Sequence, residues 1–318
     1  MNNFKKLKIV FMGTPGFGAR ILEELVKVHD VVLAVTQPDK LVGRKQVVEY
    51  SEVKKKAIEL GIPVFQPVKI REEYEEILKY DFDLIVTAAF GQIVGMKLID
   101  YPKYKAINVH GSLLPKGRGG APIQRSIMNG DTETGITIMY MAKGMDSGDI
   151  IAQEKLRIED DDNTDTLFAK MAELGAKMIN PVIESIVNGT SERIVQDDSC
   201  ATYTYNLEKS DELIDFKRSA RLVNCQIRAL ASEPGAYFTI DGIKYKVYAS
   251  KVIDRIYDLD PGTICNVTKK TFEIVCGDKK TIEISEIKKE GKNLMKVQDF
   301  MNGAGRSILV SGKRIDNW

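Results

Sequence analysis

The sequence predicts two domains of different fold class: an N-terminal Rossmann-like α/β domain with a parallel sheet, and a C-terminal small β-barrel of the OB-like type. The 318 residues exceed the usual length of one domain. Apolar runs of strand length alternate with segments of helical periodicity in the first half of the chain. From residue 209 onward the apolar runs are short and separated by turn signals. We therefore expect domains at 1–189 and 209–318, joined by a linker at 190–208.

In the N-terminal domain, each expected strand is an apolar run bounded by turn residues, and each expected helix carries apolar residues on one face. GTPGFG at 13–18 forms the turn after the first strand, and Asn163-Thr164-Asp165 supplies capping residues for a long helix. A functional site is expected at the carboxyl ends of the parallel strands. Strands are expected at 7–12, 31–35, 62–65, 84–88, 106–110, 135–141 and 149–156, and helices at 19–28, 52–60, 72–79, 122–128 and 162–187.

The C-terminal domain is predicted from strands at 236–240, 244–249, 271–275 and 281–284. Residues 209–318 hold 20 basic and 15 acidic side chains, against 26 and 30 in residues 1–208. The whole chain has a net charge of +1, which gives no general argument for nucleic-acid binding. The basic C-terminal part nevertheless permits an anionic partner.

The sequence contains no run of 18 apolar residues, and its first apolar run is too short for a signal peptide, so we expect a soluble cytoplasmic protein.

The 4 cysteines form no CxxC pair and the chain has 2 histidines. We therefore expect reduced, buried thiols and no metal site.

GTPGFG, between a strand and a helix, is similar to a dinucleotide-binding fingerprint. That fingerprint also requires an acidic residue about 20 positions further on, where this chain has Asp39 after a proline turn. Pro15 removes a backbone amide that a pyrophosphate would use. We expect a strand-to-helix turn without NAD; the alternative, a non-enzymatic dinucleotide-binding module, is testable by an NAD titration.

A polar pair ends the apolar strand at 106–110. Asn108 and His110 are two residues apart, so both side chains leave the same face of an extended strand. A lone histidine is more often structural than catalytic. This pair would be costly to bury without a function, however, and Gly111 lets the backbone approach a ligand. We interpret Asn108 and His110 as candidate catalytic groups.

GMDSGD at 144–149 offers an acidic partner for this pair. Asp146 and Asp149 are equal candidates on local sequence. The alternative is an ordinary turn in which Asp binds its own backbone.

NVHGSLLPKGRGGAPIQRSIMNGDTETGITIMYMAKGMDSGDII at 108–151 resembles the signature of the folate-dependent formyltransferases. FMGTPGFG, VTQPDKLVGR and IPVFQP extend the resemblance over nearly the whole chain, as does the β-rich C-terminal region. The resemblance implies a catalytic trio of Asn108, His110 and Asp146, and 10-formyltetrahydrofolate as the formyl donor. It also implies folate binding, for which the candidates are Ser112, Leu113, Leu114 and Pro115, with Phe90, Gly91 and Ile93 placed by position.

The chemistry of formyl transfer suits these three side chains. Attack by an amine puts negative charge on the formyl oxygen, which preorganised donors stabilise. The Asn108 carboxamide and a protonated His110 would be the donors, and His110 would also supply the proton for the leaving nitrogen. Asp146 would accept a proton from the amine, directly or through water, and its charge would favour the protonated imidazole. The reaction needs no covalent enzyme intermediate and no metal.

The acceptor implied by the resemblance is initiator methionyl-tRNA, formylated for translation initiation in a bacterial cytoplasm by a monomeric enzyme. The loop from Asp39 to about Lys54 would enter the acceptor end of the tRNA, with Lys40, Arg44 and Lys45 as basic contacts. A solvated surface loop is the alternative. This loop departs from the family pattern, because it reads GRKQVVEYSEV where members usually continue GRGKKL with prolines. ALASEPGAY likewise lacks the NPWP-like stretch.

The same trio would serve other enzymes of the family. These are formyltransferases acting on a small amine, such as an amino sugar or glycinamide ribonucleotide, and formyl-folate hydrolases. The catalytic residues do not separate these functions, so the loop around Arg44 and the basic C-terminal domain carry the distinction.

Overall fold

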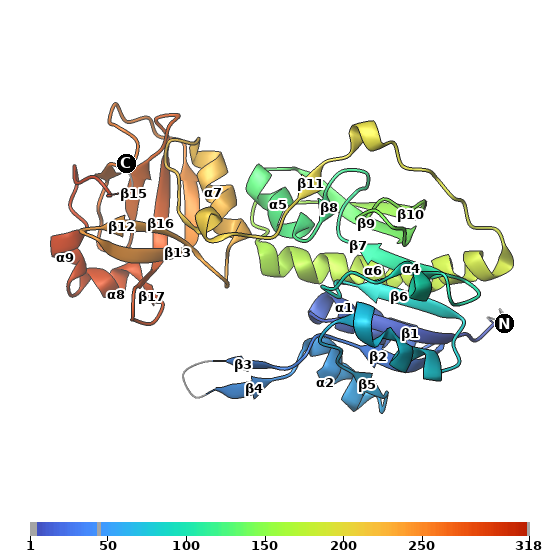
Figure 1. Ribbon diagram of the computed structural model, residues 1–318. Coiled ribbons are helices and arrows are strands. Elements are labelled where there is room, and N and C mark those ends of the chain that lie inside the picture. Colours follow the sequence, from blue (N-terminus) through green and yellow to red (C-terminus); the bar gives the residue numbers. More distant parts are fainter. Residues whose placement is uncertain (1–4, 43–45, 317–318) are drawn as a thin grey trace. The chain divides into compact units, whose positions relative to one another are not determined.

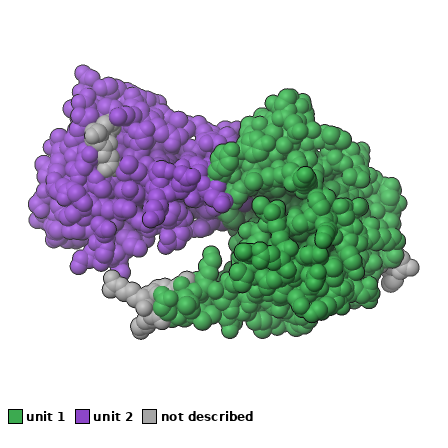
Figure 2. All heavy atoms as spheres, in the orientation of Figure 1, with its two compact units in different colours: residues 1–122, 133–157, 168–205 green, residues 123–132, 158–167, 206–318 purple. Residues whose placement is uncertain are grey.

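The computed structural model describes residues 5–42 and 46–316 of the chain (Figure 1). The chain forms two compact units (Figure 2). Unit 1 consists of residues 1–122, 133–157 and 168–205, and unit 2 of residues 123–132, 158–167 and 206–318. Helix α6 (Thr164–Asn188) begins in unit 2 and continues into unit 1. Within the described residues, no helix is long and apolar enough to cross a membrane.

Unit 1 is built on a seven-stranded sheet with the order β10-β9-β7-β6-β1-β2-β5. The strands from β7 to β5 are parallel, and β9 and β10 are antiparallel to their neighbours. The predicted Rossmann-like class is confirmed. An apolar run does not encode its direction, so the sequence could not reveal that β9 runs opposite to the other strands of the sheet. The strands are β1 (Lys8–Gly13), β2 (Asp30–Val35), β5 (Val64–Phe65), β6 (Leu84–Ala88), β7 (Ala106–His110), β9 (Glu133–Tyr140) and β10 (Ile150–Arg157).

Helices cover both faces of this sheet (Figure 1). On one face lie α1 (Gly16–Leu25) and α6, where Gly175 lets α6 approach Ile21 of α1 and Val109 of β7. On the other face, a buried core joins β1, β2 and β6 to three short helices. These are α3 (Ile70–Glu73), the 3-10 helix η1 (Tyr74–Lys79) and α4 (Met96–Ile99).

The segment expected as a loop after β2 contains a hairpin of β3 (Lys40–Val42) and β4 (Val47–Glu49), which is followed by α2 (Glu52–Glu59). Leu41 and Val48 pair across the hairpin and are 59% and 53% exposed. Lys54 of α2 holds both ends of the hairpin, since its Nζ lies 2.6 Å from Asp39 Oδ2 and 3.9 Å from the Tyr50 ring centroid. The hairpin therefore projects an apolar surface from a fixed base.

Part of the segment expected as a linker runs back over unit 1. Ile194 forms an antiparallel bridge with Ile150 of β10. Further on, after the 3-10 helix η2 (Asp198–Cys200), β11 (Tyr203–Thr204) pairs in parallel with β8 (Arg118–Gly119). Residues 190–205 thus belong to unit 1, and unit 2 resumes at residue 206.

Unit 2 contains a six-stranded antiparallel sheet that curls as a half-barrel, with the order β12-β13-β16-β15-β14 and β17 paired to β16. The predicted β-rich fold is confirmed. Phe216, Phe238, Tyr245 and Phe272 pack their rings together in its core. The strands are β12 (Ala236–Ile240), β13 (Ile243–Ile253), β14 (Ile264–Cys265), β15 (Phe272–Val275), β16 (Thr281–Lys289) and β17 (Met295–Lys296).

The helices of unit 2 include α5 (Pro122–Asn129), whose Arg125 forms an ion pair with Asp211 at 2.7 Å. Helix α7 (Ala220–Ala229), which we did not predict, packs against β13. The 3-10 helix η3 (Lys209–Glu212) and the helices α8 (Val297–Met301) and α9 (Gly305–Ile308) complete the unit.

All four cysteines are free thiols. Cys225, Cys265 and Cys276 are buried as expected, and burial raises the pKa of Cys265 to about 11. The expectation is wrong for Cys200, which lies exposed in η2 because this helix sits on the surface of unit 1.

Candidate active site

Strand β7 carries the predicted polar pair to the carboxyl edge of the parallel sheet. β7 lies between β6 and β9, and it ends at His110. Asn108 and His110 are on the same face of the strand because they are two residues apart. His110 is 6% exposed, so little water reaches its imidazole.

The Asn108 carboxamide is oriented by Thr87 of β6. The Thr87 hydroxyl donates to Asn108 Oδ1 at 2.8 Å, and Thr87 is 3% exposed. Because the carboxamide oxygen is held, the Nδ2 hydrogens point away from Thr87, and among the described residues they have no acceptor. Asn108 therefore presents free N–H donors at the strand end.

The His110 ring is fixed from the opposite side. Its Nε2 lies 2.9 Å from the Gly117 carbonyl oxygen, and since a carbonyl only accepts, Nε2 must carry the hydrogen. Its Nδ1 then faces Asp146, with 3.7 Å between Nδ1 and Oδ2. Nδ1 is therefore the ring nitrogen that can take part in proton transfer.

Asp146 is brought to His110 by an unusual backbone conformation. Its φ of 46° lies in the left-handed region, which a non-glycine residue adopts at a cost. Asp146 Oδ2 accepts the Gly119 N–H at 2.8 Å, and the side chain is 17% exposed. The second carboxylate oxygen, Oδ1, accepts nothing from the described part of the chain.

Asp149, the competing acidic residue in the sequence, has a different environment. It forms an ion pair with Arg193 at 2.8 Å, and the Arg193 guanidinium also lies over the Tyr140 ring at 4.5 Å. The geometry thus brings Asp146 to His110 and engages Asp149 in an exposed ion pair.

The predicted folate-binding stretch directly follows His110. Thr137 of β9 accepts the Leu114 N–H at 3.1 Å and donates to the Ser112 carbonyl at 2.6 Å, which fixes the stretch beside the sheet. The Ser112 hydroxyl donates to the Lys116 carbonyl at 2.7 Å, so it closes this turn rather than facing outward. The Leu114–Pro115 peptide bond is cis, and Leu113 is half-buried.

The second predicted folate segment follows β6, the strand beside β7. Phe90 is buried, and its carbonyl accepts hydrogen bonds from Thr14 at 2.9 Å and Gln37 at 3.1 Å. Gly91 has a φ of 86°, a left-handed conformation that suits glycine, and Ile93 is 64% exposed. Since β6 and β7 are parallel neighbours, this segment starts at the same edge as the catalytic pair.

Close packing against β6 explains the glycines of the GTPGFG turn. Helix α1 begins at Gly16, with Pro15 at the N-cap. A Cβ on Gly13 or on Gly18 would lie 2.9 Å from the Ala88 carbonyl oxygen. These glycines therefore let α1 and β6 approach closely.

Of the predicted tRNA-binding residues, Lys40 is exposed at the start of β3. Arg44 and Lys45 lie outside the described residues.

No cluster of three or more His, Cys, Asp or Glu side chains that could hold a metal ion occurs within residues 5–42 and 46–316.

Sequence reasoning missed the residues that orient the trio. Thr87 carried a signal, because it is the polar residue in the otherwise apolar strand LIVTA. The Gly117 carbonyl and the Gly119 N–H are backbone groups, which no residue type reveals. Gln196 and Arg118, which bind each other near Asp146, also gave no local signal.

Two family models match the chain. Residues 7–183 match the one described as formyl transferase, and residues 206–305 match the one described as formyl transferase, C-terminal domain.

Similar curated proteins are the methionyl-tRNA formyltransferases of two Staphylococcus aureus strains, bovine RF122 / ET3-1 at 45% identity and MW2 at 44%. Each match covers 97% of this chain and 99% of the relative.

Solved structures share the fold at lower identity. An N-formyltransferase from Helicobacter canadensis, in complex with folinic acid and dTDP-3-aminofucose, superposes with a TM-score of 0.68 at 22% identity, over 87% of this chain and 98% of its own. HypX from Aquifex aeolicus, in complex with tetrahydrofolic acid, gives a TM-score of 0.66 at 16% identity, over 95% of this chain and 48% of its own.

Proposed function

The chain belongs to the formyl transferase family and within it to the methionyl-tRNA formyltransferases, and we propose that it transfers the formyl group of 10-formyltetrahydrofolate to the α-amino group of initiator methionyl-tRNA. The product is N-formylmethionyl-tRNA, the substrate of translation initiation. The observation that carries formyl transfer is the arrangement of Asn108, His110 and Asp146, with Asp146 Oδ2 3.7 Å from His110 Nδ1. The choice of acceptor is supported by the 45% identity to a methionyl-tRNA formyltransferase over 97% of the chain. We expect a monomeric enzyme of the bacterial cytoplasm.

Asn108 and His110 stabilise the charge that develops on the formyl oxygen. The Asn108 Nδ2 hydrogens are available because Thr87 holds the carboxamide oxygen. His110 Nδ1, when protonated, is a second donor beside Asp146. Such donors stabilise an oxyanion by about 3–4 kcal/mol each when they are fixed before the reaction, as they are here.

Asp146 accepts the proton that the attacking amine loses. Its Oδ2 is held by the Gly119 N–H, and Oδ1 is free to accept a proton directly or through water. The amine nitrogen forms a bond to the formyl carbon, the carbon–nitrogen bond to the folate breaks, and His110 supplies the proton that the leaving nitrogen takes up. The chain's own residues thus account for every proton transfer in the step.

The folate donor would bind along the two segments that start at the same edge of the sheet. Ser112, Leu113, Leu114 and Pro115 form one wall. Phe90, Gly91 and Ile93 form the other. Leu114 and Phe90 are buried, and they would give the pterin an apolar wall, while Ile93 is exposed enough to contact a ligand directly.

The N-terminal domain expected at 1–189, to which residues 190–205 of unit 1 are added, would carry catalysis, and residues 209–318 would bind the tRNA. In unit 2, Lys244 and Lys246 alternate with the buried Tyr245 and Val247, so both lysines face outward from β13. Lys246 is paired across strands with Lys288 of β16. Directly opposed like charges repel, and a bound phosphate would relieve the repulsion.

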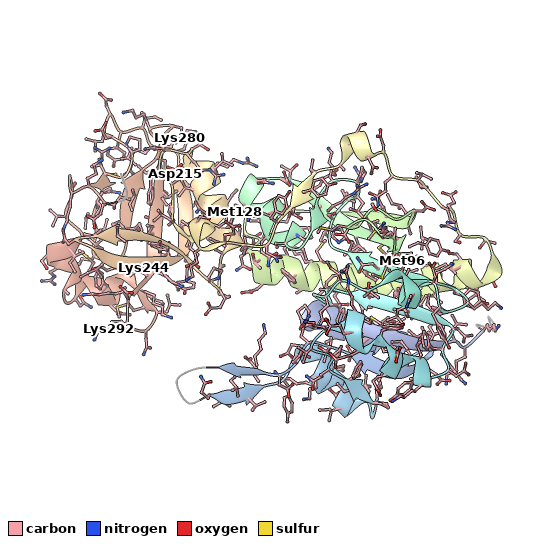
Figure 3. The ribbon with its side chains drawn as sticks, in the orientation of Figure 1. Met96, Met128, Asp215, Lys244, Lys280 and Lys292 are labelled. Carbon is pink, nitrogen blue, oxygen red and sulfur yellow. The ribbon has the colours of Figure 1, made fainter. Side chains whose placement is uncertain are left out.

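The other lysines of the unit do not all share this face. Lys244 and Lys292 lie toward one end of β16, and Lys280 lies toward the other (Figure 3). Lys280 forms an ion pair with Asp254 at 2.7 Å, so its charge is already balanced. We therefore assign phosphate contact in unit 2 to Lys244, Lys246 and Lys288. In the segment from Asp39 to Lys54, the proposed tRNA contacts remain Lys40, Arg44 and Lys45.

Formylation assays with several acceptors test the proposal. Purified protein and 10-formyltetrahydrofolate are incubated with methionyl-tRNA, with an amino-sugar nucleotide, with glycinamide ribonucleotide, or with no acceptor. We expect transfer to methionyl-tRNA alone, with a kcat/KM that falls steeply as salt rises. Faster transfer to either small amine, or formate release without an acceptor, would replace this function by the corresponding alternative.

A further inference from the structure

The loop that carries Asp146 is held by hydrogen bonds from residues of other segments. Asp146 adopts its left-handed conformation between β9 and β10, and its side chain is held by the Gly119 N–H. A single hydrogen bond to the side chain does not fix the backbone from which the carboxylate extends. The backbone carbonyls of Asp146 and Gly148 have their own partner, the side chain of Gln196.

Gln196 uses both hydrogens of its amide on this loop. Its Nε2 donates to the Asp146 carbonyl at 2.8 Å and to the Gly148 carbonyl at 2.7 Å. Gln196 is 9% exposed, so these bonds are shielded from water. The two bonds hold the loop on either side of Ser147, next to the residue that faces His110.

Arg118 fixes the orientation of the Gln196 amide. Its Nε and Nη2 lie 3.1 and 2.8 Å from Gln196 Oε1. A guanidinium only donates, so Oε1 must face Arg118 and Nε2 must face the loop. Arg118 is 3% exposed and forms an ion pair with Asp198 at 2.8 Å, which anchors it in turn.

These contacts meet at one short strand pair. Arg118 and Gly119 make up β8, so the residue that orients Gln196 adjoins the residue whose N–H binds the Asp146 carboxylate. β8 pairs with β11, which follows Gln196 in the chain. The side chain and the backbone of Asp146 are thus held by one connected group.

We propose that Gln196, oriented by Arg118, is a positioning residue for the reaction, which holds the Asp146 loop so that the carboxylate stays beside His110 Nδ1. The inference rests on the proposed function, because it assigns Gln196 a role through the base of that reaction. Gln196 does not touch the reacting atoms. Its loss lowers the rate of the chemical step and leaves substrate binding largely intact.

The experiment is a double-mutant cycle between Gln196→Met and Asp146→Asn, read by single-turnover formylation of methionyl-tRNA. Met keeps the length of the side chain and removes both donors. We expect Gln196→Met alone to lower the rate about 10- to 100-fold, as a misplaced catalytic group does, with KM for both substrates within about threefold. In the Asp146→Asn background the same change has no further effect, since the group it positions is already lost.

Arg193→Met is the matched control. Arg193 belongs to the same returning segment and binds the same loop through Asp149, outside the proposed machinery. We expect it to keep the wild-type rate. Gln196→Glu is a second variant that keeps a partner for Arg118 and removes both donors, so it carries the test if Gln196→Met does not fold.

Two outcomes overturn the inference. One is a wild-type rate for both Gln196 variants. The other is an equal loss in the wild-type and Asp146→Asn backgrounds, because a general effect on the fold does not depend on Asp146. If Asp146→Asn alone keeps the wild-type rate, the proposed base is refuted, and the inference falls with it for a distinguishable reason.

Discussion

Replacing Asp146 by Asn removes the negative charge beside His110 and almost nothing else. The Asn carboxamide oxygen still accepts the Gly119 N–H, so the loop keeps its contact. At 3.7 Å and an effective dielectric constant of about 20, the attraction between the carboxylate and a protonated imidazole is about 4 kcal/mol. That energy corresponds to a factor of roughly 10³ in rate, which agrees with the usual contribution of a general base. The two estimates describe the same carboxylate and are not added.

We therefore expect Asp146→Asn to lower kcat about 10³-fold, as measured by formylation at saturating methionyl-tRNA. Affinity for a folate analogue, measured by calorimetry, stays within about threefold, because the charge acts mainly in the transition state. Asp149→Asn, three residues further on, removes an exposed ion pair and keeps the wild-type kcat. A kcat for Asp146→Asn within tenfold of wild type would refute the assignment of the base.

Three further predictions concern the frame of the site and of the fold. Thr87→Val releases the Asn108 carboxamide and lowers kcat about tenfold, less than the roughly 10²-fold loss expected for Asn108→Ala; equal kcat values for Thr87→Val and wild type would contradict the orienting role. Gly135→Ala brings a Cβ into steric overlap with the Glu154 carbonyl oxygen, so the strands must shift, and urea unfolding should show a loss of about 1–3 kcal/mol in the free energy of unfolding; an unchanged midpoint would contradict this. Burial lowers the pKa of His29, so below about pH 6.5 the unfolded chain binds more protons than the folded one and stability falls as pH falls. His29→Gln should flatten the decline between pH 7 and 5, and identical profiles would exclude His29 as a cause.

Buried strands were the elements most predictable from the sequence. The expected bounds of 84–88, 106–110 and 236–240 match β6, β7 and β12 residue for residue, because each is an apolar run cut off by turn residues. Helix α1 begins three residues earlier than expected. Pro15 is compatible with this earlier start, because a proline at the N-terminus of a helix interrupts no helical hydrogen bond. Its carbonyl accepts the Ala19 N–H, which is the first hydrogen bond of the helix.

Other elements could not be read from apolar periodicity in the same way. The β3–β4 hairpin has exposed apolar side chains, so it lacks the alternation of a half-buried strand. Helix α7 did carry signals, namely the N-cap Ser219 and buried Val223 and Ile227 four residues apart. The short apolar runs in this part of the chain predict mostly strands.

In the site, spacing alone paired Asn108 with His110, since strand geometry fixes their common face. It did not choose between Asp146 and Asp149, because the choice depends on a left-handed backbone at Asp146 and on an ion pair with a residue more than forty positions away. Thr87 and Gln196 act through contacts that join distant parts of the chain. Such contacts exist only once the sheet is assembled.

The return of residues 190–205 over unit 1 determines where the chain could be divided by gene fusion or truncation. A fragment ending at residue 189 would lose Gln196, and with it the bond to the Asp146 carbonyl. It would also lose Thr202, whose hydroxyl accepts the Gly117 N–H, and Thr204, whose carbonyl accepts the Gly120 N–H. The smallest portable catalytic module therefore extends to residue 205, and exchange of C-terminal domains between relatives would preserve the active site only with a junction beyond that point.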